Sequence, residues 1–175
     1  VDRVAHHVTT GLSTVEISAK NSARLNSEFK EFFKIKDLKY RSYVLKGNPD
    51  KIMAVTKLLD RHEIKYGFAS TGKVSGYDFS QAKSGSMDAK GSLVVSTNQP
   101  KGKMVQVLFE PYTTVTDPLT YDITAWSVPY AYGLETVAST SLVSSEDQNP
   151  YVAAANTPMP NGAGYISKWD DISDA

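Results

Sequence analysis

Residues 40–69, YRSYVLKGNPDKIMAVTKLLDRHEIKYGFA, decide the fold. Residues 40–45 favour a strand, and the Gly-Asn-Pro-Asp that follows predicts a turn and then a helix start. Asn48 can cap this helix with its side-chain oxygen, and Pro49 suits the first helical position, where no amide hydrogen is needed. Four apolar residues then repeat at helical spacing: Ile52, Val55, Leu58 and Leu59. Residues 63–69 predict a second strand, so the stretch forms a strand-helix-strand unit whose right-handed crossover favours a parallel sheet.

The same alternation recurs further along the chain. Leu93, Val94 and Val95 predict a strand, and Pro100 opens a helix with its apolar residues on one side: Met104, Val107 and Leu108. Between them, the glycines and serines of residues 70–91 predict turns and a loop-rich excursion. We therefore expect an α/β fold with a small, mostly parallel sheet and flanking helices.

A long amphipathic helix is expected before this domain. Within residues 10–33, apolar residues follow a three-four spacing: Leu12, Val15, Ala19, Phe29 and Phe33. We expect residues 113–129 to be extended or irregular, and the polar, proline-containing residues after Val137 to form a connection. A short echo of residues 43–47 at 165–169 suggests the start of a second unit. The predicted division is 1–38, a helical segment; 39–138, the α/β domain; and 139–175, a linker and possible second unit.

Composition excludes several classes of function. The chain of 175 residues has 19 basic and 19 acidic residues, so it has no charge excess with which to bind nucleic acid. No run of about 18 apolar residues is present, so membrane insertion is not expected. The absence of cysteine excludes disulfides, thiolate zinc sites and a cysteine nucleophile. Because Val1 is not methionine and no signal-peptide pattern follows, we expect the chain to be cut from a longer precursor.

Catalytic motifs are weak. His6, His7 and His62 lack the spacing of a zinc site, so no metal ligand is predicted. Residues 67–73 have the spacing of a phosphate-binding loop, but Val74 stands where a magnesium-binding hydroxyl belongs, which favours a strand and a glycine-rich loop. The Gly-x-Ser-x-Gly signature of serine hydrolases is absent. Four carboxylates could form a catalytic pair, although solvated loop positions are the simpler interpretation: Glu110, Asp117, Asp122 and Glu135.

An aromatic cluster is the best candidate for contact with another molecule. Its members are Tyr121, Trp126, Tyr130 and Tyr132. Exposed rings could stack on sugars or hold a peptide, whereas buried rings would serve core packing or an interdomain seam. Asn98 and Gln99 are further candidates for ligand or interdomain contact.

Three motifs resemble the region after the catalytic domain of large bacterial zinc carboxypeptidase-like proteins. They are STNQP at 96–100, VLFEP at 107–111 and YDITAWSVPY at 121–130. In that family a segment similar to residues 10–15 opens a helix near the end of the peptidase domain, and an α/β segment similar to class I glutamine amidotransferases follows. The resemblance places the zinc ligands and the general-base glutamate upstream, so no catalytic residue carries over. The amidotransferase thiol has no counterpart in a chain without cysteine.

Together with the missing catalytic groups, the resemblance implies that the chain is a non-catalytic accessory region of a secreted zinc metallocarboxypeptidase-like protein. It would pack on the upstream peptidase domain, with residues 126–132 as a candidate seam, and would itself need no cofactor; the parent's zinc would activate water for hydrolysis. The resemblance implies a periplasmic or extracellular location. The alternative is a stand-alone glycan- or peptide-binding module that uses residues 121–132. A nucleotide-dependent enzyme using residues 67–73 is the third possibility.

Overall fold

The computed structural model describes residues 2–34, 38–70, 72–112 and 127–147. The chain divides into two compact units, residues 1–36 and residues 37–175. The first contains the helices α1 (Asp2–Lys20) and α2 (Ser22–Phe32), where a single helix over 10–33 was predicted. The break falls at Asn21, whose side-chain amide donates to the carbonyl of Ile17 at 2.8 Å. The backbone amide of Asn21 donates to the same carbonyl at 3.0 Å, so the Ile17 carbonyl accepts two hydrogen bonds at the break.

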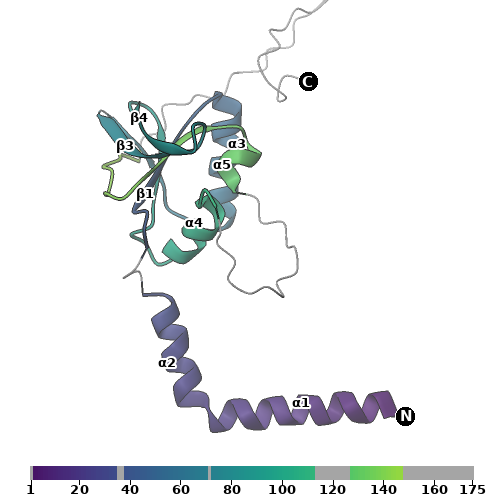
Figure 1. The fold of residues 1–175 in the computed structure, drawn as a ribbon. Coiled ribbons are helices and arrows are strands. Elements are labelled where there is room, and N and C mark those ends of the chain that lie inside the picture. The colour runs from purple at the N-terminus through teal and green to yellow at the C-terminus, as the bar shows by residue number, and fades with distance from the viewer. Residues whose placement is uncertain (1, 35–37, 71, 113–126, 148–175) are drawn as a thin grey trace, which may run out of the picture. The chain divides into compact units, whose positions relative to one another are not determined.

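The second unit is built on one six-stranded sheet (Figure 1). Its strands are β1 (Ser42–Lys46), β2 (Gly67–Phe68), β3 (Lys73–Asp78), β4 (Lys83–Asp88), β5 (Leu93–Ser96) and β6 (Glu135–Ser139). Its helices are α3 (Pro49–Arg61), α4 (Gly102–Phe109) and α5 (Val128–Ala131). The strand order is β2-β5-β1-β6-β3-β4, and every neighbouring pair is antiparallel.

The predicted mostly parallel sheet is therefore wrong. The elements β1, α3 and β2 do follow one another, but β5 lies between the two strands and pairs antiparallel with both. Likewise β1 lies between β5 and β6. Two interleaved crossover units of this kind give the split βαβ arrangement, in which strands of equal direction are never neighbours.

The prediction for the start of α3 is confirmed. The side chain of Asn48 accepts a hydrogen bond from the backbone amide of Asp50 at 2.8 Å, and Pro49 occupies the first turn. On the buried side, Ile52, Val55 and Leu59 are inaccessible to solvent. The helix thus packs through the stripe that its sequence predicted.

Both faces of the sheet are covered. Tyr43 and Leu45 of β1 point into the core shared with α3 and α4, while Val44 points to the opposite side. There Val74 and Met87, from the paired strands β3 and β4, close a second, smaller core. Figure 1 shows α3, α4 and α5 gathered on one side of the sheet. Burial on both faces explains the uninterrupted apolar run in β1.

The prediction of a loop over 70–91 is wrong for most of that stretch, because β3 and β4 form a hairpin there. Gly76 and Gly85 face each other in its register. A Cβ atom on Gly76 would lie 2.1 Å from the carbonyl oxygen of Ala138 in β6. These glycines therefore allow neighbouring strands to approach closely. Composition alone does not distinguish glycines of this kind from glycines in turns.

Three other predictions need correction. On α4 the buried residues are Gly102, Val105 and Phe109. Of the predicted face, Met104 and Val107 are exposed, and only Leu108 packs, partly buried, against the core. Strand β6 continues to Ser139, into the predicted connection, and Glu146 then pairs with Phe68. The extended or irregular structure expected over 113–129 is wrong at Val128 and Pro129, which begin the helix α5. Residues 113–126, the rest of that stretch apart from Ser127, and the possible second unit at 165–169 lie outside the described residues.

Candidate functional site

The strongest candidate site is an open cavity between the start of α3 and the end of α5. Its volume is about 420 Å³. Asp50, Lys51 and Ala54 line one side, and residues 130–133 line the other. This volume lies within the range of small-molecule sites.

The α3 side of the cavity supplies the charged groups. Asp50 lies in the first turn of the helix, where the macrodipole stabilises a carboxylate. Its backbone amide is already bound by the Asn48 cap, so the cap fixes the turn that carries both Asp50 and Lys51. The cavity thus has one carboxylate and one ammonium group on adjacent residues.

The α5 side supplies two aromatic rings. The ring of Tyr130 packs against Phe79 with 5.1 Å between centroids, and its hydroxyl donates to the Phe79 carbonyl at 3.4 Å. Burial, followed by the neighbouring phenol of Tyr77, raises the pKa of Tyr130 above its ordinary value. Tyr130 is still 46% exposed, while Tyr132 is partly buried against the main core.

Gly133 shapes the remaining wall. Its φ of +59° is in the left-handed region that favours glycine, and it ends the short turn after α5. A Cβ atom at this position would lie 3.4 Å from the Lys51 ammonium nitrogen. The glycine therefore leaves room between Lys51 and the aromatic side of the cavity.

The predicted contact residues separate into two groups. Tyr130 and Tyr132 line the same cavity, whereas Asn98 and Gln99 are not among its lining residues. Asn98 is exposed, and Gln99 is buried. Trp126 and Tyr121 lie outside the described residues.

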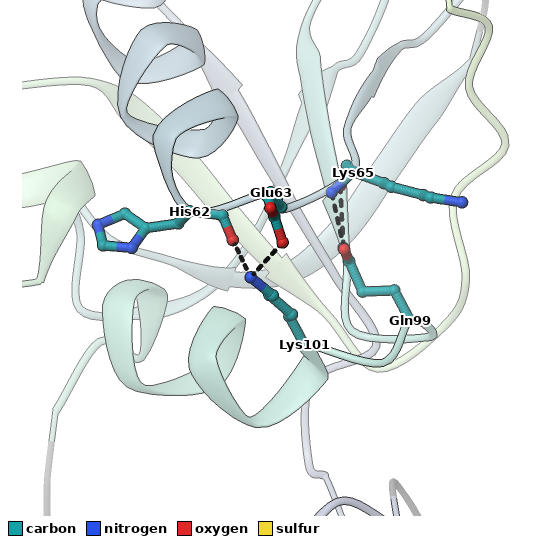
Figure 2. A network of polar contacts seen from close by, with 5 residues as sticks. All are labelled: His62, Glu63, Lys65, Gln99 and Lys101. Atoms are coloured by element: carbon teal, nitrogen blue, oxygen red, sulfur yellow. Dashed lines mark hydrogen bonds and ion pairs between the residues drawn. The ribbon is translucent and has the colours of Figure 1, made fainter.

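Gln99 belongs to a structural network at the end of α3 (Figure 2). Its amide oxygen accepts from the Lys65 backbone amide at 2.7 Å, and its amide nitrogen donates to the Lys65 carbonyl at 2.9 Å. Nearby, the Lys101 ammonium donates to the carbonyl of His62 at 2.6 Å and pairs with Glu63 at 3.1 Å. Because these bonds go mainly to backbone groups, the network holds the connection between α3 and β2 in place.

The other sequence candidates do not assemble into a reactive centre among the described residues. His6 and His7 lie on α1 and His62 at the end of α3, and the described part of the chain contains no cluster of three or more metal-binding side chains. Lys73 opens β3, so a strand follows the glycine-rich loop where a phosphate site would need a helix. Of the four carboxylates, Asp117 and Asp122 lie outside the described residues, while Glu110 follows α4 and Glu135 opens β6.

Comparison of the chain with protein-family models, curated proteins and solved structures finds no match. Tyr130 and Tyr132, predicted from the sequence as contact residues, line this cavity, whereas the sequence did not predict Asp50, Lys51 or Gly133 as contact residues. Their only sequence signals were the capped start of α3 and a glycine placed directly after the aromatic residues.

No helix in the described ranges is both long and apolar enough to cross a membrane. The first unit nevertheless exposes much apolar surface. Along α1 the side chains of Val4, Val8, Leu12 and Val15 are all more than half exposed. On α2, Phe29 and Phe32 are exposed to a similar degree.

Proposed function

We propose that the chain is a non-catalytic accessory region of an exported zinc metallocarboxypeptidase-like protein, attached to the peptidase domain through α1. The observation that carries this proposal is the apolar stripe of α1. Val4, Val8, Leu12 and Val15 repeat at spacings of four, four and three residues, which places them on one face of a helix. Their exposures are 67%, 54%, 67% and 68%.

A regular apolar stripe favours a protein partner. Burying one such side chain fully contributes about 2 kcal/mol, so covering the four partly exposed side chains would contribute roughly 5 kcal/mol. An isolated helix of this length is only marginally stable in water, because most helix stability in proteins comes from packing of the apolar face. Contact with a partner would therefore both bury the stripe and stabilise the helix.

The peptidase domain is the partner that the sequence favours. Residues 10–15, which include the last two residues of the stripe, resemble a segment that opens a helix near the end of that domain in zinc carboxypeptidase-like proteins; here they lie inside α1, which begins at Asp2. The motifs at 96–100, 107–111 and 121–130 follow in the order seen after the catalytic domain. In this proposal, α1 completes the packing of the peptidase domain and the sheet unit follows as an appended module. Zinc and the water-activating groups belong to the peptidase domain, and export is proposed on the same resemblance.

Binding of the full chain to a zinc carboxypeptidase domain tests the proposal. The domain would come from a protein whose post-catalytic region carries the same three motifs, and calorimetry would measure its affinity. Leu12→Glu places a charge in the stripe and should weaken binding at least about tenfold. Ser13→Glu adds the same charge outside the stripe and is the matched control.

Two results would overturn the proposal. One is equal affinity for the wild-type chain and Leu12→Glu. The other is zinc-dependent hydrolysis of peptides by the chain alone that persists through repurification, since the accessory region is expected to lack turnover.

A further inference from the structure

We propose that the cavity between α3 and α5 is a binding site for a neutral sugar ring. The inference is independent of the attachment through α1, since it rests only on side chains of the second unit. Two features are decisive: an anchored aromatic surface on one side, and a balanced pair of polar groups on the other.

The aromatic side is preorganised. Tyr130 is fixed by its contact with the Phe79 ring and by the bond from its hydroxyl to the Phe79 carbonyl, yet nearly half of its surface is exposed. Tyr132 is anchored against the main core. Rings held in this way lose little conformational freedom when they bind the flat, C–H-bearing face of a pyranose.

The polar side matches the hydroxyl groups of a sugar. The carboxylate of Asp50 can accept hydrogen bonds and the ammonium of Lys51 can donate them, and together they carry no net charge. Because the two opposite charges lie on adjacent residues, neither an anionic nor a cationic ligand would gain a net attraction from the pair. A wholly apolar ligand would remove water from both charges without replacing their hydrogen bonds.

The architecture favours a sugar over an extended peptide. Peptides are commonly bound by addition to the edge of a sheet, where backbone groups pair along the strand. The cavity is instead lined by the start of α3 and by residues 130–133, with no strand residue among them. Its open form and volume of about 420 Å³ suit one or two rings of a longer saccharide.

Titration of the full chain by NMR tests this site directly. The probes are three neutral oligosaccharides: maltotriose, cellotriose and the trimer of N-acetylglucosamine. At least one should cause saturable shifts in the amides of residues 50–54 and 130–133, with a Kd of about 1 mM or below.

Variants separate binding in the cavity from binding elsewhere. Tyr130→Ala should weaken the responding probe at least about tenfold, while Tyr130→Phe should retain most of the affinity because the ring remains. Ala54→Phe should block the cavity from α3 and abolish the shifts, even if Tyr130→Ala proves poorly folded. Tyr112→Ala removes an exposed tyrosine that does not line the cavity and should leave the affinity unchanged.

Three outcomes would overturn the proposal. The first is the absence of saturable shifts with every probe at about 10 mM, a concentration well above the expected Kd. The second is shifts of undiminished size in Ala54→Phe. The third is binding of a tripeptide in the cavity when none of the three sugars causes shifts.

Discussion

Replacing Gly76 with alanine should destabilise the second unit, because β3 passes β6 at a distance that leaves no room for a side chain. The added Cβ would lie 2.1 Å from the Ala138 carbonyl oxygen and 2.7 Å from its carbon, whereas ordinary contact begins at 3.4 Å. The obstructing atoms are backbone and cannot rotate away. The two strands would have to separate by about 1 Å where Tyr77 pairs with Ala138.

Gly76→Ala should lower the free energy of unfolding by about 2 kcal/mol. Overpacking a well-packed site costs about 1–3 kcal/mol, and the severity of this contact places Gly76→Ala near the upper end. Reduced freedom of the unfolded chain offsets about 0.5–1 kcal/mol. A net loss of about 2 kcal/mol corresponds to a fall in Tm of roughly 8 °C for a unit of this size.

Urea unfolding followed by near-ultraviolet circular dichroism would measure this loss, since the second unit holds the ordered tyrosines. Ser75→Ala, at the neighbouring exposed position, is the control and should change stability by less than about 0.5 kcal/mol. If Gly76→Ala unfolded at the same urea concentration as Ser75→Ala, the passage of β3 across β6 would not be as close as the structure has it.

Three further predictions concern polar side chains of the second unit. The buried hydroxyl of Tyr43 has no hydrogen-bond partner in the described part of the chain, so Tyr43→Phe should raise the unfolding free energy by about 1 kcal/mol; a comparable loss in urea unfolding would contradict this. The Ser80 hydroxyl donates to the Asp78 carboxylate and lowers the pKa of Asp78 below its usual value. The ionised carboxylate therefore stabilises the folded state. Its contribution is complete above the pKa that Asp78 has in the unfolded chain and is lost as the pH falls through its pKa in the folded chain. Between about pH 6 and pH 3, wild type should therefore lose more stability than Asp78→Asn, and equal losses would count against the assignment. The Lys39 ammonium lies 3.1 Å from the Tyr112 hydroxyl and lowers the pKa of that phenol, so Lys39→Met should raise the Tyr112 pKa in an NMR titration; an unchanged value would exclude the contact in solution.

Local structure was predictable where a few neighbouring residues determine it. The cap at Asn48, the proline at the first turn and the apolar spacing of α3 act within one helix, and the structure contains each of them. Strand order depends on pairing between distant segments, so the same sequence unit was compatible with either a parallel pair or an intervening antiparallel strand. The placement of β5 between β1 and β2 overturned the parallel sheet for that reason.

The structural roles of the glycines were the hardest feature to predict from the sequence. The glycine-rich composition around Gly76 and Gly85 suggested turns. In the structure, a side chain at Gly76 would clash with the backbone of β6, and one at Gly85 would clash with the side chain of Asp78. The candidate site was predictable only in part. Tyr130 and Tyr132 were predicted as contact residues because they are aromatic. Lys51 was not predicted, because it lies on α3, which is distant from these tyrosines in sequence and adjacent to them in space.

Hydrogen exchange of the full chain, with and without a saturating zinc carboxypeptidase domain, tests the proposed attachment most directly. The amides of α1 should become strongly protected when the domain is added, because the exposed stripe is then covered, while those of β4 should keep their exchange rates. If the amides of α1 exchange at the same rates with and without a saturating concentration of the domain, the proposed attachment through α1 is contradicted.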